Sequence, residues 1–157
     1  MSAAKIRKAK IPDVSQIQKL INQFAKRELM LPRSLSDIYE SLRDFWICEL
    51  NNRIIGCCAL HVTWKDLAEV RSLAVNKRYQ RRGIARQLIN AAINEAKELG
   101  CKSIFALTYA PDYFRKYGFR RVSKQRLPHK IWAECINCPK FPDCKEVALI
   151  KKLGVMG

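Results

Sequence analysis

The sequence predicts one domain of the α/β class, in which helices flank a mixed sheet. Three observations support this fold class: several β-rich runs, a strand–helix–strand unit in the middle of the chain, and a closing strand. The 157 residues, 48% of them hydrophobic, suit a single core. The sequence contains no repeat, low-complexity segment or linker, so we expect residues 1–157 to form a single domain.

The N-terminal part is expected to hold a strand and two helices. Lys5 to Ala9 (KIRKA) can form a short strand, and Asp13 suits the first turn of a helix, where a carboxylate meets the helix dipole. A second short helix is expected from a Ser36 cap through Leu42. The first helix is predicted from apolar residues at i, i+3, i+4 and i+7: Ile17, Leu20, Ile21 and Phe24.

Three strands should follow. Residues 45–50 and 53–62 flank Asn51-Asn52, a favourable hairpin turn, and residues 67–75 are rich in β-formers. This part of the chain therefore predicts an antiparallel meander.

A long helix is expected to begin after Gly83 and to end at Gly100. Residues 103–109 predict another strand, residues 111–118 a short helix or turn, and Lys145 to Lys152 the last strand. One face of the long helix is apolar: Ile84, Leu88, Ala92, Ala96 and Leu99.

The net charge of +16 predicts attraction to anions such as nucleic acid, an acidic membrane face or a polyanionic small ligand. A merely well-solvated surface is the alternative. The segment 77–86 (KRYQRRGIAR) concentrates five basic residues, which favours a specific anionic ligand there.

The same segment joins a predicted strand to a predicted helix. Backbone N–H groups at a helix N-terminus form a natural cradle for a pyrophosphate, and Gly83 lets the backbone come close to phosphate oxygens. Neighbouring arginines add charge-assisted hydrogen bonds. A tight turn before a basic, solvated helix is the alternative interpretation. The candidate residues are Gln80, Arg81, Arg82, Gly83, Ile84, Ala85 and Arg86.

The run VRSLAVNKRYQRRGIARQLINAAINEA (70–96) resembles the acetyl-CoA-binding motif of GNAT N-acetyltransferases, and YFRKYGF (113–119) resembles their aromatic-rich turn. The resemblance implies the GNAT fold: mostly antiparallel strands, a central splayed strand pair and flanking helices. It also implies that acetyl-CoA is the co-substrate. The backbone of Leu73, Ala74 and Val75 would meet its pantetheine arm, and Arg81 to Arg86 its pyrophosphate.

Four segments, residues 29–49, 68–75, 105–119 and 127–135, resemble short bacterial N-acetylglutamate synthases. This resemblance implies transfer of acetyl from acetyl-CoA to the amine of L-glutamate, the first step of arginine synthesis. The 157 residues leave no room for the amino-acid-kinase-like domain that binds arginine in the long synthases, so feedback inhibition by arginine is not carried over.

The reaction needs a general base, because a glutamate ammonium must lose a proton before it attacks the thioester. Glu69 matches the base of the family; the alternative is a structural carboxylate paired with Arg71. A cation also suits an acceptor with two carboxylates. Arg33 matches a substrate-binding arginine of the synthases, and Lys130 and Arg71 are further candidates, each alternatively an ordinary surface charge.

A tyrosine four residues before the Gly of the Gly-Phe pair protonates the leaving thiolate in many GNAT enzymes. Phe114 stands there in this sequence, which removes the usual acid, and neither Tyr113 nor Tyr117 occupies the matching register. Thr108 matches the proton donor proposed for the synthases and could instead hold a water molecule.

The seven cysteines do not predict a disulfide framework, because the number is odd and no secretion signal accompanies them. Four are expected in the core: Cys48, Cys57, Cys58 and Cys101. The segment 127–145 is expected to be an insert rich in Cys and Pro. A tetrahedral zinc site there is the alternative to reduced thiols, but the second C-x₂-C pair is missing, so we expect no metal. Its candidate ligands are His129, Cys135, Cys138 and Cys144.

The sequence has no apolar run long enough for a membrane span and no signal-peptide core, so we expect a cytoplasmic protein without a membrane partner. No nucleic-acid-binding motif is recognised, and nucleic acid is not the expected partner. A homodimer is possible. Two alternatives stay open: a GNAT enzyme acting on another amine, such as a protein N-terminus, and a basic nucleic-acid binder with a zinc loop.

Overall fold

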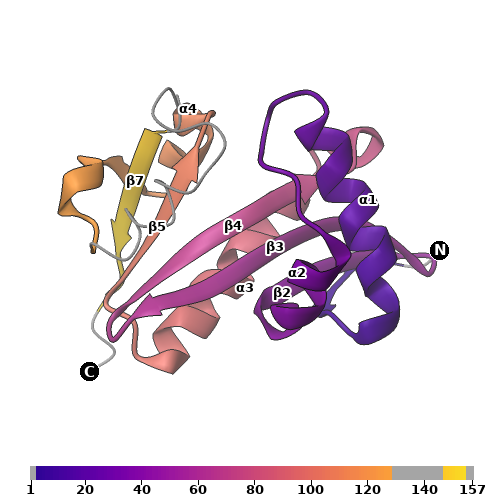
Figure 1. Ribbon diagram of the computed structural model, residues 1–157, viewed down its shortest axis with the longest axis horizontal. Helices are drawn as coiled ribbons and strands as arrows, with labels where there is room; N and C mark the ends of the chain where they lie inside the picture. Colours follow the sequence, from indigo (N-terminus) through magenta and orange to yellow (C-terminus); the bar gives the residue numbers. More distant parts are fainter. Residues whose placement is uncertain (1–2, 129–146, 155–157) are drawn as a thin grey trace.

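A computed structural model of the protein describes residues 3–128 and 147–154. The described chain forms one sheet of seven strands, flanked by helices on both faces (Figure 1). The elements are β1 (Lys5–Lys8), α1 (Val14–Ala25), α2 (Leu35–Glu40), β2 (Phe45–Leu50), β3 (Arg53–Trp64), β4 (Leu67–Val75), α3 (Ile84–Leu99), β5 (Ser103–Thr108), α4 (Pro111–Arg115), β6 (Arg120–Arg121) and β7 (Val147–Lys152).

The strands lie in the order β1-β2-β3-β4-β5-β7-β6. β4 and β5 run parallel, because α3 connects them as a crossover, and the other described neighbours are antiparallel. The helices α1 and α2 cover one face of the first strands, and α3 covers the opposite face (Figure 1). The predicted fold class is confirmed.

The sheet divides at its centre. Among the described residues, β4 and β5 pair over three positions, from Leu67↔Ser103 to Glu69↔Phe105. Beyond Glu69 the two strands diverge, so the upper half of β4 lies apart from β5 and β7 (Figure 1). This divergence is the splayed strand pair that the sequence predicts through its resemblance to the GNAT fold.

Two apolar clusters pack helices against the sheet. One cluster packs α3 against the sheet and includes Leu88, Ile89 and Ile104; the other packs α1 against it and includes Ile17 and Phe45. The four cysteines expected in the core are buried: Cys48, Cys57, Cys58 and Cys101.

Several element boundaries differ from the sequence-based expectations. The cap of α2 is Ser34, not Ser36, and the helix ends at Glu40 rather than Leu42. The Ser34 hydroxyl accepts a hydrogen bond from the Asp37 amide at 3.1 Å, because an N-cap side chain bonds the amide three residues later.

Two side chains also depart from their predicted surroundings. Leu99 shares its helical spacing with the buried stripe of α3 but is 59% exposed, because it lies in the last turn, where the described residues leave it uncovered. Asp13 belongs to a short 3-10 turn (Ile11–Asp13) that precedes α1. Besides lying near the positive end of the helix dipole, its carboxylate forms an ion pair with Arg7 at 2.8 Å.

The strand predicted at residues 53–62 extends to Trp64.

No helix among residues 3–128 and 147–154 combines the length and apolar character needed to cross a membrane.

Candidate active site

A cavity of about 1050 Å³ lies on the side of the molecule where β4 separates from β5. Its walls come from four regions far apart in sequence: the loop between α1 and α2, the upper half of β4, the start of α3, and the end of β5 with α4. Predicted site residues gather along it: Arg33, Glu69, Arg71, Leu73, Ala74, Val75, Gln80, Arg81, Gly83, Ile84, Ala85, Arg86 and Thr108.

The loop of residues 80–86 meets the cavity at the N-terminus of α3. Gly83 is the N-cap, with φ +81°, and a Cβ added there would meet no described atom within 4 Å. The Gln87 amide donates to the Gly83 carbonyl at 3.1 Å, so the amides of residues 84–86 precede this helical bond at the positive end of the dipole. The backbone therefore presents donors toward open space, as an anion requires.

Two predicted cofactor residues have structural contacts of their own. The Gln80 side chain donates to the Val75 carbonyl at 3.0 Å, which ties the loop to the end of β4. Arg82 does not line the cavity; its guanidinium lies 5.5 Å from the centre of the Tyr79 ring. Arg81 and Arg86 do line the cavity, so an anion bound there would be attracted more strongly by these two arginines than by Arg82.

A β-bulge lies in the upper half of β4. Gly56 to Cys57 pair with Val75 to Ala74, whereas Ala59 pairs with Arg71, so Ser72 and Leu73 face Cys58 alone. Ser72 has φ +53°, a left-handed conformation that costs about 1 kcal/mol or more in a non-glycine residue. A bulge interrupts strand pairing and re-aims the backbone, which leaves Leu73 to Val75 along the cavity wall.

Two contacts hold this bulge. The Cys57 thiol donates to the Ser72 carbonyl at 3.3 Å, and Arg33 donates through Nη1 to the Ser72 hydroxyl at 3.4 Å. Burial raises the pKa of the Cys57 thiol to about 12, so the donor stays protonated.

Glu69 lies at the last paired position before the splay. Its side chain is 9% exposed, and Oε1 accepts from Arg71 Nε at 2.6 Å. The carboxylate is thus both paired with Arg71 and part of the cavity wall. The pairing expected as the alternative to a base is present, and it does not remove the carboxylate from the cavity.

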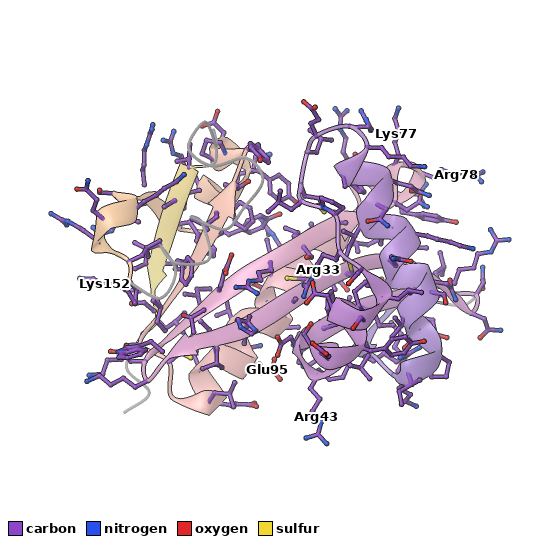
Figure 2. The ribbon with its side chains drawn as sticks, viewed as in Figure 1. Arg33, Arg43, Lys77, Arg78, Glu95 and Lys152 are labelled. Carbon is purple, nitrogen blue, oxygen red and sulfur yellow. The ribbon has the colours of Figure 1, made fainter. Side chains whose placement is uncertain are left out.

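Arg33 projects from the loop before α2 toward the centre of the molecule (Figure 2). It donates through Nε to Asp37 at 2.7 Å and through Nη2 to the Ser41 hydroxyl at 2.9 Å, and it lies 5.3 Å from the centre of the Phe45 ring. The hydrogen bond from Arg33 lowers the pKa of Asp37. An acceptor carboxylate would therefore meet a guanidinium that Asp37 already orients.

The wall formed by β5 and α4 contains polar and aromatic groups. Thr108 ends β5, and its hydroxyl accepts from the Ala110 amide at 2.9 Å. Phe114 is buried against Phe119, with ring centres 5.3 Å apart. Tyr113 does not stand in the register of the family's tyrosine, but it lines the cavity. Its pKa is raised, mainly by burial and secondly by a hydrogen bond with Tyr117.

Three groups near the site were not predicted from the sequence. Asp37 and Ser41 orient Arg33, and a signal for Asp37 existed in its i, i+4 spacing from Arg33. His61 lies opposite Glu69 on β3, a relationship that depends on strand register and has no local sequence signal.

The described residues fit acetyl-CoA as a co-substrate. An outward-facing helix N-terminus with basic neighbours suits its pyrophosphate, and the bulged strand offers backbone groups to an extended arm. The splay supplies the space between these two features.

The sequence pattern that describes the Acetyltransferase (GNAT) family matches residues 11–119, more than half of the chain. The chain belongs to this family.

Two relatives of this acetyltransferase match it over most of both chains. An uncharacterized N-acetyltransferase of Chlorobaculum tepidum is 37% identical over 148 residues, which is 94% of this chain and 96% of the relative. An amino-acid acetyltransferase of Mycobacterium tuberculosis is 30% identical over 132 residues, 82% of this chain and 75% of the relative. A 32% identical amino-acid acetyltransferase of Pseudomonas syringae is much longer, and the match spans 29% of it.

Solved structures agree with the fold. A Mycobacterium tuberculosis protein in complex with CoA has a TM-score of 0.82 and 25% identity, over 96% of this chain and 99% of that one. N-acetylglutamate synthase of Neisseria gonorrhoeae, complexed with coenzyme A and N-acetyl-glutamate, has a TM-score of 0.87 over 99% of this chain and 36% of that one; at 24% identity it supports the fold alone. The protein is an acetyl-CoA-dependent acetyltransferase.

Some predicted residues lie outside the described part of the chain. These are Lys130 and the four candidate metal ligands His129, Cys135, Cys138 and Cys144. Within residues 3–128 and 147–154, no group of three or more His, Cys, Asp or Glu residues is placed to hold a metal ion.

Proposed function

We propose that this acetyltransferase transfers the acetyl group of acetyl-CoA to the α-amine of L-glutamate, by direct attack while both substrates are bound. The observation that supports this acceptor most directly is the meeting of Arg33, Glu69 and Arg71 in one cavity with the 80–86 loop. Two guanidinium groups suit the carboxylates of glutamate, and one carboxylate suits the removal of its ammonium proton. The amino-acid acetyltransferases among the relatives support the same class of acceptor.

Each residue has a proposed role in the reaction. Arg33, oriented by Asp37, binds an acceptor carboxylate. Arg71 donates to Glu69 and balances the negative charge at this end of the cavity. Glu69 accepts the proton of the ammonium, directly or through water, and frees the nitrogen lone pair for attack. Thr108 lies at the opposite wall and stabilises the departing sulfur through its hydroxyl or a water molecule. Lys130 is a further candidate for the acceptor carboxylates.

The cofactor-binding roles follow from the backbone. The amides of Ile84, Ala85 and Arg86 and the side chains of Arg81 and Arg86 are proposed to bind the pyrophosphate. The bulged segment of Leu73 to Val75 is proposed to pair with the pantetheine arm, because among the described residues no strand pairs with β4 on the splayed side beyond Glu69. Binding both groups fixes the thioester beside Glu69.

The test is a thiol-release assay with acetyl-CoA and a panel of amines: glutamate, glutamine, other amino acids, polyamines and peptides that begin at a free N-terminus. We expect glutamate to give the highest kcat/KM, with N-acetylglutamate identified as the product by mass spectrometry. Turnover of a peptide but not of glutamate would contradict the proposed acceptor. A steep salt dependence of nucleic-acid binding, with no thiol release from any amine, would contradict the enzyme reading as a whole.

A further inference from the structure

Glu69 has an imidazole neighbour on the adjacent strand. His61 of β3 stands directly opposite Glu69 of β4 in the antiparallel register. Directly opposite residues share one face of a sheet, with Cβ atoms about 4.5–5.5 Å apart. The two titratable side chains therefore emerge side by side at the inner end of the splay.

His61 is held by a second carboxylate. Its Nδ1 lies 2.7 Å from Oδ2 of Asp44, which belongs to the 3-10 turn Leu42–Asp44 that precedes β2. A carboxylate at Nδ1 favours the tautomer with the proton on Nδ1, which leaves Nε2 able to accept a proton, and it stabilises the imidazolium once this forms.

His61 and Asp44 are both more exposed than Glu69. The side chain of Glu69 is 9% exposed, whereas those of Asp44 and His61 are 27% and 35% exposed. His61 thus lies between a nearly buried carboxylate and water. Within residues 3–128 and 147–154, Arg71 is bonded to Glu69, and the charge of Asp37 on α2 interacts with both His61 and Arg71.

The proposed reaction releases a proton that needs a path to water. An ammonium and a thioester give an amide, a thiol and one proton: the nitrogen loses two protons besides gaining the acetyl carbon, and the sulfur takes one of them. The other proton passes to Glu69. A base enclosed to 9% exposure must return to its ionised form before the next turnover.

We infer that the Asp44–His61 pair is the exit route for this proton, a relay that accepts it from Glu69 at Nε2, directly or through water, and delivers it to the solvent. This role rests on the proposed function of Glu69 as the base. His61 does not line the cavity, so its proposed role is that of a positioning and relay residue rather than a catalytic one.

The first experiment compares two variants, His61→Gln and His61→Ala. The Gln amide can still donate a hydrogen bond toward Asp44, but it cannot take up and release a proton. In thiol-release assays with glutamate at low buffer concentration, we expect both variants to lose about ten-fold or more of kcat, less than the loss of the base itself. The KM for acetyl-CoA should stay unchanged. Added imidazole should restore turnover in His61→Ala, and the variants, unlike the wild type, should become faster with rising buffer concentration.

A second experiment needs no acceptor and separates failure of the relay from failure of the proposed function. Proton NMR at a fixed pH follows the ring resonances of His61, identified by their loss in His61→Gln. We expect these resonances to move in Glu69→Gln, because a neighbouring carboxylate becomes an amide, and to move further in Asp44→Asn, because the carboxylate bonded to the ring is lost.

The outcomes are distinct. If the wild type does not acetylate glutamate, the proposed function fails, and the NMR comparison still decides whether the His61 ring and Glu69 interact. Unchanged His61 ring resonances in Glu69→Gln would overturn the relay. Wild-type turnover of His61→Gln at every buffer concentration would overturn it as well.

Discussion

Glu69 is nearly enclosed, yet its carboxylate forms part of the cavity wall. This arrangement follows from its place on β4: it is the last position at which β4 is covered by β5, and the sheet opens immediately after it. The 2.6 Å bond from Arg71 favours the ionised carboxylate, the form that accepts a proton. A single side chain thus combines a structural ion pair with a position suited to a general base.

Replacing this carboxylate tests the combination. We expect Glu69→Gln to lower kcat by about 10²–10⁴-fold at neutral pH, because the amide keeps the shape but cannot take a proton. The melting temperature shows whether loss of the pair with Arg71 also affects the fold. Glu98→Gln, an exposed change on α3, is the matched control. A wild-type rate in Glu69→Gln would remove it from the role of base.

Arg33 has a different kind of role at the same scale, because Asp37, Ser41 and Ser72 hold its guanidinium in place before any substrate arrives. We expect Arg33→Ala to raise the KM for glutamate far more than the KM for acetyl-CoA, as measured by thiol release. Arg43→Ala is the control, since Arg43 is exposed and points away from the body of the molecule (Figure 2). Equal shifts of both KM values would deny Arg33 a specific role toward the acceptor.

At the scale of elements, the junction between β4 and α3 builds the proposed anion site from backbone. β4 ends at Val75, Gln80 ties the loop back to that strand end, and Gly83 turns the chain into α3 through a positive φ. The open space above Gly83 is where a side chain would compete with a bound anion. Lys77 and Arg78 lie on the outer edge of this loop and project into solvent (Figure 2).

Substitutions at Gly83 separate charge from shape. Asn and Asp both tolerate the left-handed region, so Gly83→Asn and Gly83→Asp should fold alike. We expect Gly83→Asp to abolish measurable binding of CoA in calorimetry, because the carboxylate meets the phosphates, and Gly83→Asn to weaken binding less. Gly100→Asn places the same change at the positive-φ C-cap of the same helix and controls for strain. Unchanged affinity in Gly83→Asp would refute the loop as the pyrophosphate site.

At the scale of the whole molecule, a few partly buried ion pairs connect elements in a chain of net charge +16. Arg7 on β1 bonds both Asp13, at the entry of α1, and Glu49 on β2. The hydrogen bond from Arg7 lowers the pKa of Asp13, and the Lys10 amide bonds the same carboxylate at 2.7 Å. This carboxylate contributes stability that is present above its usual pKa and is lost as pH falls through its lowered value.

Asp13→Asn should therefore reduce the free energy of unfolding by about 1–3 kcal/mol at pH 7, because two charge-assisted bonds are weakened. The deficit should shrink as the pH falls below about 4, because the wild-type carboxylate then takes up a proton in the unfolded chain while it stays ionised in the folded one down to its lowered pKa. Urea unfolding at several pH values measures this difference. Asp112→Asn is the matched control, since its pair with Arg115 is exposed and worth little. A pH-independent deficit would contradict the role of the Asp13 charge.

The order of elements and the glycine turn that begins α3 could be predicted from the sequence because their causes are local. Alternation and helical spacing depend on neighbours a few residues apart. The positive φ of Gly83 and Gly100 could be predicted because glycine, which has no Cβ, adopts this conformation without strain. The start of α2 was predicted two residues too late: Ser34 rather than Ser36 is the cap, and its hydroxyl accepts from the Asp37 amide.

The tertiary structure alone decided which groups meet. The register that places His61 beside Glu69, the fold that brings Arg33 to the bulge at Ser72, and the burial that separates Leu99 from the rest of its helical face depend on contacts between residues distant in sequence. The sequence by itself thus determined the family fold and the chemistry of the candidate site. The three-dimensional packing determined how those groups are paired and enclosed, because pairing and burial are properties of space rather than of the chain.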